Sequence, residues 1–558
     1  MRIATRCGTC RVRKIKCDRA RPACSRCLST GRVCEGYGVW GGGNNPFGHQ
    51  QLTARGRRLP IPRSVAHVVV ASLAPEEQAC AEWFVHHTAT WMSGAFASAF
   101  WHTLVLQANS HEPAVLHATA ALAAVEKRKF LASGPPPKAK QDLDDEERFV
   151  LCQYNKAIQH VRPLLSSGDR ASARVVAIAC MLFTCLEFIR CRYTAGCTHL
   201  SNGLRLLEGM DAREGSYEDD WLYEVFFTLT VHSALLSHSV PHPHVQHPPP
   251  LVASPSLARY ESVSQARQHL DRLLSATHSL AARCLAARCL HRQDTRPSAD
   301  LLLCQRRICE GLRTWEAGYR VLKARTFGAF DQVAQRDHKA LRLLSVHHTL
   351  ATVLSATCLC GEDESVFDRH TQSFVRLMRQ AVKLVELVSP QKVSKTPAYM
   401  GVDRWQFSAD MGLIPPLFYT ALKCRVLHVR MQAIKLLRVL DHQEGIWDAA
   451  LAAAMAEEVV GYESRGAQHE SVTDAHGFLP ESEWPQTVMP GRFWVQQVDI
   501  VLPDESMGNV RMACRCQKDD GSQDSFEREF AYTSGKGYVA MQGGKNGDLS
   551  PPLQPDIL

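Results

Sequence analysis

The chain has 558 residues, of which 45% are hydrophobic and 22% are charged, and its formal net charge is +8. This length suggests roughly three or four domains, and the composition is ordinary for a soluble protein. No stretch reaches the ~20 consecutive apolar residues of a membrane-spanning helix. The most apolar run, 175–189, contains Glu187, so we predict a buried core helix there and no membrane association.

Six cysteines occupy the first 34 residues and follow the spacing C-x2-C-x6-C twice. A zinc ion takes about four soft ligands, so two separate all-thiolate sites would need eight cysteines. Six are enough if two are shared, and the internal repeat favours the first cysteine of each half, Cys7 and Cys24. We therefore predict a compact cluster of two Zn2+ ions. Its ligands would be Cys7, Cys10, Cys17, Cys24, Cys27 and Cys34.

Basic residues are concentrated in the same short segment. Residues 1–34 contain ten Lys or Arg and a single acid, Asp18, so their formal charge is +9, whereas residues 35–558 sum to −1. Bound zinc and its thiolates would lower the charge of the module only modestly. A basic block on a small rigid module is typical of nucleic-acid binding, so we expect a nucleic acid as partner.

The same cysteines would also fit a disulfide framework or a metal-storage peptide. The N-terminal sequence MRIATRCGTC has no apolar signal-peptide core, and metal storage does not need ten basic residues. The other fifteen cysteines are scattered, mostly in apolar helical contexts, which suits a reducing compartment. The C-x-C pairs at 358–360 and 514–516 have no partners at metal-ligand spacing, so we expect no metal there.

The segment RCGTCRVRKIKCDRARPACSRCLSTGRVCEGYG resembles the DNA-binding domain of the fungal binuclear zinc-cluster transcription factors. All six cysteines match, as do the basic stretch ahead of Cys17 and Pro22, where that family turns its chain between the halves. The resemblance implies a domain at residues 1–36 in which Cys7 and Cys24 bridge both metals. It further implies a nuclear, sequence-specific regulator of RNA polymerase II transcription that binds double-stranded DNA.

The resemblance also assigns the DNA contacts. Lys14, with Arg13 beside it, would reach base edges in the major groove at a CGG-like triplet, while Lys16, Arg11 and Arg19 would face phosphates. A short helix fits the major groove, and Lys or Arg pairing with guanine gives roughly 1–3 kcal/mol of discrimination. A module of about 30 residues cannot bury enough apolar surface to fold alone, so zinc would supply its folding energy.

Residues 37–74 are predicted to form a flexible linker, because they are rich in Gly, Pro and basic residues and lack helical periodicity. Many members of the family dimerise through a coiled coil here, but this segment has no repeating apolar a and d positions. Dimerisation by that route is therefore not expected. Arg55, Arg57, Arg58 and Arg63 would contact phosphates, serve nuclear import or remain solvated linker charge.

Residues 75–465 carry apolar residues at i, i+3, i+4 and i+7, which predicts a large all-α domain. Segments beginning at Pro113, Val175 and Gly412 resemble the helical fungal-specific regulatory domain that follows the zinc cluster in this family. The resemblance implies a regulatory role, with co-regulators or an effector ligand as partners, and it names no ligand. Three predicted core stripes are Tyr193, Cys197, Leu200, Leu204 and Leu207; Leu270, Leu273, Leu274 and Thr277; and Leu422, Val426, Val429, Ala433, Leu436 and Leu440.

Two stretches interrupt the helical pattern. GPPPKAK at 134–140 is predicted to be a loop. The second is rich in His and Pro, with histidines at 238, 242, 244 and 247. These histidines would fit a metal site, but prolines disfavour a rigid ligand scaffold, so an exposed connection is the preferred interpretation.

Residues 466–558 are predicted to be a C-terminal extension, partly strand-like and with a disordered end. RFWVQQVDIVL, NVRMACRCQ and FEREFAYT are typical of strands, whereas the Gly- and Pro-rich stretch from Ser534 is expected to be disordered. The acids around Phe526, Phe530 and Tyr532 fit either a plain hairpin or a small activation segment. The predicted fold class is therefore mainly α, with a small zinc module, a linker and a short β-containing or disordered tail.

We find no G-x-S-x-G, H-E-x-x-H, G-x-x-x-x-G-K-[ST] or strand-linked G-x-G-x-x-G motif in the sequence. The histidine pairs at 86–87 and 347–348 lie in helical patterns and are predicted to be ordinary core or surface residues. We therefore expect a DNA-binding regulator rather than an enzyme. The alternative is a zinc- or redox-sensing interaction protein whose DNA binding is only non-specific, and therefore falls steeply with salt and ignores base changes.

Overall fold

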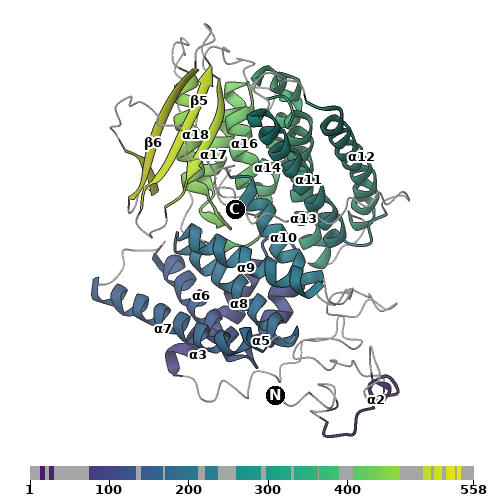
Figure 1. The fold of residues 1–558 in the computed structure, drawn as a ribbon, viewed down its shortest axis with the longest axis vertical. Helices are drawn as coiled ribbons and strands as arrows, with labels where there is room; N and C mark the ends of the chain where they lie inside the picture. Colours follow the sequence, from purple (N-terminus) through teal and green to yellow (C-terminus); the bar gives the residue numbers. More distant parts are fainter. Residues whose placement is uncertain are drawn as a thin grey trace.

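The computed structural model describes most of the chain between Pro75 and Glu463, together with parts of both ends (Figure 1). The predicted linker up to residue 73, the His- and Pro-rich loop and residues 133–139 lie outside the described residues. The described residues are 10, 13–18, 24–30, 74–132, 140–167, 170–211, 220–236, 259–290, 297–327, 332–361, 363–388, 406–464, 494–503, 508–517, 523–533 and 537–541.

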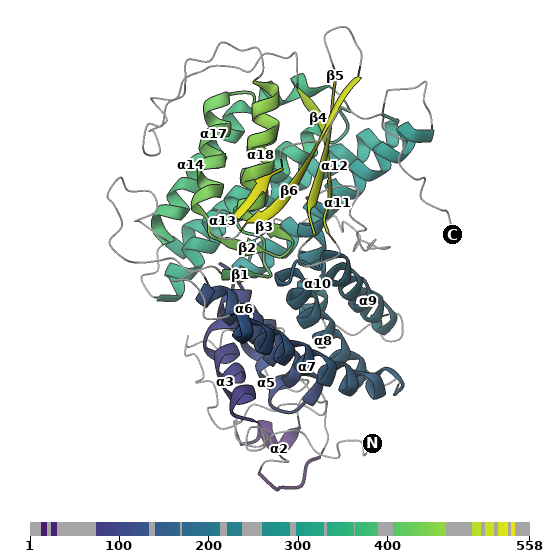
Figure 2. The ribbon, with the colours of Figure 1, turned by 90° about the vertical axis from the view of Figure 1, so that its left-hand side faces the viewer.

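Helices dominate the described chain and form two groups, one from α3 to α9 and one from α11 to α18, with α10 between them (Figures 1 and 2). This confirms the predicted mainly helical fold class. The first group comprises α3 (Pro75–Trp83), η2 (Phe84–Thr88), α4 (Ala89–Met92), η3 (Phe100–Leu104), α5 (Val105–Asn109), α6 (Pro113–Ala132), α7 (Lys140–Leu165), α8 (Arg170–Ile189) and α9 (Tyr193–Asp211). The remaining helices are α10 (Asp220–Ala234), α11 (Val263–Leu290), α12 (Ala299–Phe327), α13 (Gln332–Thr357), η5 (Glu364–His370), α14 (Thr371–Val388), α16 (Ile414–Lys423), α17 (Leu427–Val439) and α18 (Ala449–Glu463).

Helix α8 is the centre of the first group, where it packs on α6, α7 and α9. Its stretch Ala171–Ile189 is the one helix in the described chain that is long and apolar enough to cross a membrane, and 89% of that window is buried inside the protein. Glu187 within it is buried and lies 3.5 Å from the guanidinium of Arg190. The prediction of a buried core helix for this run is confirmed.

Two of the three predicted core stripes form continuous helix faces. The stripe at 193–207 lies on α9 and the stripe at 270–277 lies on α11, and every residue of both is buried. The histidine pairs also behave as predicted, because His86 and His87 are exposed, while His347 and His348 are buried. Helical periodicity therefore located these core faces correctly.

The third stripe is buried over most of its length but does not belong to one helix. Helix α16 ends at Lys423, and α17 begins at Leu427. Cys424 and Val426 between them have extended backbone, with ψ of 137° and 112°. At the break Lys423 Nζ lies 2.6 Å from Glu364 Oε1. An apolar period predicts which side chains are buried, but it does not show where a buried charge breaks the helix.

A three-stranded sheet is inserted in the helical region, where we predicted helices alone. Strand β1 (Gln406–Ser408) pairs in parallel with β2 (His442–Glu444), which pairs antiparallel with β3 (Trp447–Asp448). These strands have two or three residues each. Such lengths are too short to produce a recognisable alternation in the sequence.

The carboxylate of Glu444 explains why α16 begins where it does. It accepts hydrogen bonds from the backbone N–H groups of Gly412 at 2.8 Å, Leu413 at 2.9 Å and Ile414 at 3.1 Å. The first helical positions have unpaired N–H groups and favour negative charge. Pro415, in the first turn, has no N–H to satisfy. Strand β2 therefore supplies the cap that positions α16.

A four-stranded antiparallel sheet follows α18 and packs beside it (Figure 1). The three strands that we predicted are confirmed. They are β4 (Val495–Val501), β5 (Val510–Gln517) and β6 (Gln523–Thr533), and β7 (Gly537–Ala540) completes the order β4-β5-β6-β7.

Strand β7 corrects the prediction of disorder from Ser534, at least for its four residues. Its Tyr538 is buried and pairs in register with Tyr532 on β6, so an aromatic cross-strand pair stabilises a Gly-rich segment. The acidic segment next to it is part of the antiparallel β5–β6 hairpin, which was one of the two alternatives given for it. Phe526 and Phe530 on β6 are buried, and the Phe526 ring stacks on Tyr462 of α18 at 4.3 Å. Residues 542–558 lie outside the described residues.

A buried ion pair joins α17, α18 and the C-terminal sheet. The side chains of Arg430 and Glu463 are both 0% exposed and are hydrogen-bonded to each other. The second carboxylate oxygen of Glu463 accepts the backbone N–H of Val495 at 2.7 Å, and Arg430 donates to the carbonyl of Ala421. Because both charges are paired and bonded, their burial is tolerated.

We expect Glu463→Ala to destabilise the helical region by about 3–5 kcal/mol, because the substitution leaves a buried guanidinium unpaired. Glu457→Ala is a matched control, since Glu457 on α18 pairs with Arg438 on α17 and both side chains are over a third exposed. That exposed pair should contribute about 1 kcal/mol or less. Urea denaturation followed by circular dichroism measures both variants. Equal losses of stability in the two variants would contradict the assignment.

Candidate zinc cluster and nucleic-acid interface

Four of the six predicted zinc ligands lie in the described chain, and all four are buried. The Sγ atom of Cys10 lies 3.6 Å from that of Cys24 and 3.9 Å from that of Cys27. Two sulfurs bound to one tetrahedral zinc, at a Zn–S distance of about 2.3 Å, are about 3.8 Å apart. A disulfide bond would bring its sulfurs to about 2.05 Å. The Cys10–Cys24 spacing therefore fits two ligands of one zinc, and neither distance fits a disulfide bond.

Cys10, Cys17 and Cys24 form a ligand set, with sulfur atoms that all lie within 4.8 Å of one another. Among the described residues, this is the one group of three or more His, Cys, Asp or Glu side chains that could hold a metal ion. Three thiols leave one tetrahedral position for a fourth ligand. Cys7 and Cys34 lie outside the described residues.

A short helix, α2 (Ser25–Leu28), orders the second cysteine pair. Cys24 is its N-cap residue, and the Cys24 sulfur accepts the backbone N–H of Cys27 at 3.3 Å. Such a bond stabilises negative charge on sulfur, which is the form that binds metal. Asp18 reaches the same helix end, where its carboxylate accepts the N–H of Ser25 at 3.1 Å. These hydrogen bonds from Ser25 lower the pKa of the Asp18 carboxyl below its ordinary value.

The first half ends its helical turn at Lys14. The backbone N–H of Ile15 donates to the carbonyl of Cys10 at 3.1 Å, and Lys14 has a φ of 54°. Many helices end with a residue in the left-handed conformation, usually glycine, followed by an N–H that bonds to a carbonyl five residues earlier. A left-handed lysine is uncommon and strained. Lys14 is exposed and lies between the buried residues Cys10 and Cys17 along the chain.

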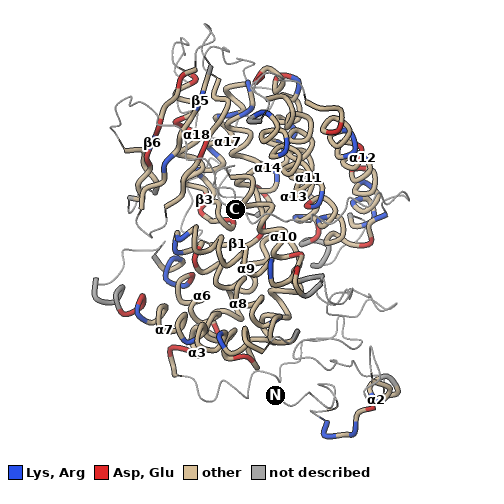
Figure 3. The backbone as a smooth tube through the Cα atoms, in the orientation of Figure 1, with Lys and Arg blue, Asp and Glu red and all other residues tan. Residues whose placement is uncertain are grey.

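The described segment before α2 carries Arg13, Lys14 and Lys16, and Lys and Arg positions are blue on the backbone in Figure 3. Lys14 and Lys16 are exposed, whereas Arg13 is half-buried and donates to the Thr30 hydroxyl at 3.3 Å. Arg11 and Arg19 lie outside the described residues. The equivalent stretch of the second half, between Cys27 and Cys34, contains one basic residue, Arg32. The two halves thus match in cysteines but not in charge.

Sequence reasoning missed the roles of Asp18 and Thr30. Thr30 accepts from Arg13 and donates to the carbonyl of Arg26 at 2.8 Å, so it connects the basic segment to the end of α2. One available signal was that Asp18 is the only acid among the first 34 residues. Thr30 carries no such signal, because its contact depends on how the two halves fold together.

Comparison with known proteins identifies this N-terminal module. Residues 5–39 match the fungal Zn(2)-Cys(6) binuclear cluster domain. The chain is 29% identical over 215 residues to the aspercryptin biosynthesis cluster-specific transcription regulator atnN of Emericella nidulans. The aligned region covers 36% of this chain and 34% of that protein. It is 25% identical over 211 residues to the transcription regulator lscL of Purpureocillium lilacinum, which covers 36% of this chain and 48% of that protein.

A shorter match is 42% identical over 64 residues to the transcriptional regulatory protein moc3 of Schizosaccharomyces pombe, covering 12% of this chain and 11% of that protein. The matched parts therefore span less than half the length of these relatives. No solved structure matches the chain.

The family match covers all six cysteines, and the described sulfurs have the spacing that zinc requires. Its relatives are fungal transcription regulators. Residues 5–39 are therefore a Zn(2)-Cys(6) binuclear cluster domain, which binds two zinc ions.

Proposed function

We propose that this protein is a nuclear, sequence-specific regulator of RNA polymerase II transcription that binds double-stranded DNA at a CGG-like triplet. One observation carries the proposal. A cluster of buried thiols at metal-ligand spacing fixes a strongly basic segment, and Lys14 is exposed at the end of its helical turn. The curated relatives are transcription regulators, and the proposed function includes no catalysis.

The proposed DNA contacts divide into two kinds. Lys14 reads base edges, because it stands at the exposed end of a turn narrow enough for the major groove. Arg13 supports it from one side, since its bond to Thr30 restricts its motion. Lys16, Arg11 and Arg19 contact phosphates, which add affinity but carry no sequence information. The helical region then regulates this activity through co-regulators or an effector.

The two zinc ions are proposed to share Cys7 and Cys24. Cys24 belongs to the described set with Cys10 and Cys17, and it also caps the helix that contains Cys27. It therefore adjoins the predicted ligands of both metals. Cys7 is the equivalent residue of the first half by the sequence repeat.

Replacement of a shared ligand should damage the cluster more than replacement of a terminal one. We expect Cys24→Ser to lose most zinc from both sites, whereas Cys34→Ser should keep a larger share because it disturbs one site. Cys424→Ser is the control, since Cys424 is buried at the end of α16, far along the chain from the cluster. Zinc bound per purified chain measures the effect. Equal zinc loss in the Cys24 and Cys34 variants would contradict the bridging assignment.

Lys14→Gly separates the backbone role of Lys14 from its side-chain role. Glycine adopts positive φ without strain, so the module should keep its zinc and its fold. Loss of the lysine should remove roughly 1–3 kcal/mol of discrimination between a CGG-containing duplex and a mismatched one. Competition binding assays at fixed salt measure this difference.

Lys16→Gln is the control for phosphate contacts. It should weaken binding to all duplexes about equally. It should also reduce the slope of the logarithm of affinity against the logarithm of salt concentration by about one, because one fewer counterion is released. If Lys14→Gly instead weakens matched and mismatched duplexes to the same extent, the base-reading role is wrong. Binding by the unaltered protein that ignores sequence altogether would favour the non-specific sensor over a sequence-specific regulator.

A further inference from the structure

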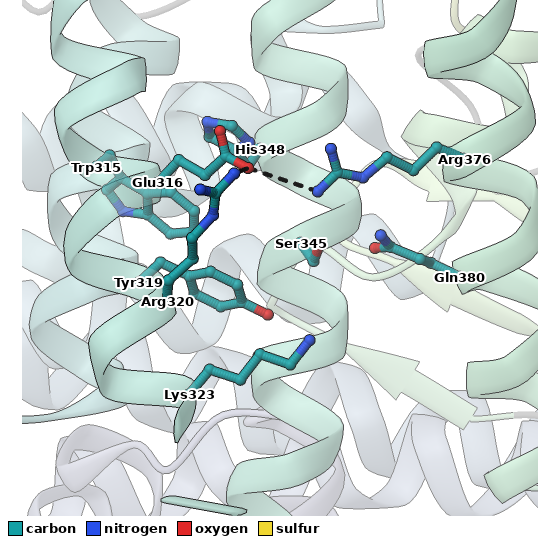
Figure 4. A pocket seen from close by; sticks show the side chains of 9 residues that line it. All are labelled: Trp315, Glu316, Tyr319, Arg320, Lys323, Ser345, His348, Arg376 and Gln380. Atoms are coloured by element: carbon teal, nitrogen blue, oxygen red, sulfur yellow. Dashed lines mark hydrogen bonds and ion pairs between the residues drawn. The ribbon is translucent and has the colours of Figure 1, made fainter. Parts of the chain in front are cut away.

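A pocket of about 160 Å³ opens in the second helical group, where α13 lies between α12 and α14 (Figure 4). It is far along the sequence from the zinc cluster, and no catalytic or metal motif maps to it. Residues from three helices line it. They are Trp315, Glu316, Tyr319, Arg320 and Lys323 from α12, Ser345 and His348 from α13, and Arg376 and Gln380 from α14.

Three stacked rings form a buried wall behind the pocket, where Trp315 is 0% exposed, Tyr319 5% and His348 8%. Trp315 lies between Tyr319 and His348, with centroid distances of 4.9 and 4.8 Å and interplanar angles of 13° and 15°. Each ring is anchored by a polar bond to a backbone carbonyl. Trp315 Nε1 donates to Ala266 and Tyr319 Oη donates to Leu341, and His348 Nε2 lies 3.1 Å from the carbonyl of Leu312. The wall is therefore already formed before any ligand binds.

This wall contributes no charge at neutral pH. Burial is the main cause that lowers the pKa of His348 below its ordinary value, although the Leu312 carbonyl and Glu316 oppose the shift. The His348 ring is therefore neutral. The buried stack therefore gives the pocket a rigid, uncharged support.

The rim of the pocket has excess positive charge. Arg320 and Arg376 face a single carboxylate, Glu316, so these three side chains together carry a formal charge of +1. Glu316 Oε1 accepts from Arg320 Nη2 at 2.9 Å and lies 3.7 Å from Arg376 Nη2. Each guanidinium has five N–H donors in a planar fork, so one carboxylate oxygen uses only a small part of them. In Figure 4 the cationic side chains approach the pocket from opposite helices.

Gln380 gives the pocket a second requirement. Its amide oxygen Oε1 is buried and has no hydrogen-bond partner in the protein. A buried acceptor without a donor is unfavourable by about 1–3 kcal/mol. A ligand that brings a hydroxyl donor to this oxygen would remove that cost. The lining therefore requires both an anionic group and a hydroxyl group.

We propose that this pocket binds a small hydroxycarboxylic acid, whose carboxylate pairs with Arg320 and Arg376 and whose hydroxyl donates to Gln380. Resting on the function proposed above, the ligand would be an effector of the regulator. The size of the pocket limits the ligand to a small molecule, and its charge selects an organic anion over a neutral compound.

The experiment uses the full-length, zinc-loaded protein and L-malate as probe, with succinate as the dicarboxylate that lacks the hydroxyl. Calorimetric titration should show malate binding at one site, with succinate several-fold weaker and propionamide without effect. Arg376→Gln should weaken malate binding at least tenfold, because it removes a charge-assisted pair. Glu316→Gln should strengthen it, since it removes the competing carboxylate.

Arg313→Gln is the matched control, because Arg313 is exposed on α12 and does not line the pocket. It should leave malate affinity unchanged, and circular dichroism should show all variants folded. No heat from either dicarboxylate, or equal binding by the Arg376 and Arg313 variants, would overturn the proposal. If Glu316→Gln fails to strengthen binding, the assigned anion position is wrong.

DNA binding is measured on the same samples without any carboxylate. Sequence-specific DNA binding without malate binding would reject the pocket proposal alone. Malate binding by a protein that does not discriminate DNA sequences would instead reject the proposed regulatory function.

Discussion

The N-terminal module depends on cysteine sulfurs from the two halves of one short chain, which come together at metal-ligand spacing. Cys10 lies within 4 Å of both Cys24 and Cys27, so sulfurs that are 14 and 17 residues apart meet at one point. A segment with a formal charge of +9 over 34 residues has too little apolar surface to close by itself. Metal–thiolate bonds replace the missing hydrophobic core. They also hold Lys14 in a backbone conformation that lysine rarely adopts.

The rest of the chain is stabilised by different physics. Residues 35–558 are almost neutral overall, and their helices bury a continuous apolar core. Two buried carboxylates within this core are hydrogen-bonded, since Glu463 pairs with Arg430 and accepts the N–H of Val495, and Glu444 accepts the N–H groups at the start of α16. The positive field is thus confined to the zinc module, while the helical region offers a defined pocket. This division suits a protein in which DNA recognition and its control reside in separate parts of the chain.

The sequence predicted the parts of this structure that depend on local pattern. Cysteine spacing located the metal cluster, and apolar periodicity located α8, α9 and α11 as core helices. Prediction from the sequence failed where contacts between residues far apart in the chain determine the local structure. The break after Lys423 follows from a partner at Glu364, and strand β7 forms because Tyr538 pairs with Tyr532. The pocket is lined by residues up to 65 positions apart, from Trp315 to Gln380, so no local sequence motif predicted it.

The central claim is that two metal ions, and not disulfides or an apolar core, build the DNA-binding module. Elemental analysis of freshly purified, fully reduced full-length protein tests this claim most directly. The account predicts two zinc ions per polypeptide, both lost together when Cys7 and Cys24 are replaced. A zinc content of one or less per polypeptide, in a protein that still binds DNA with sequence preference, would contradict it.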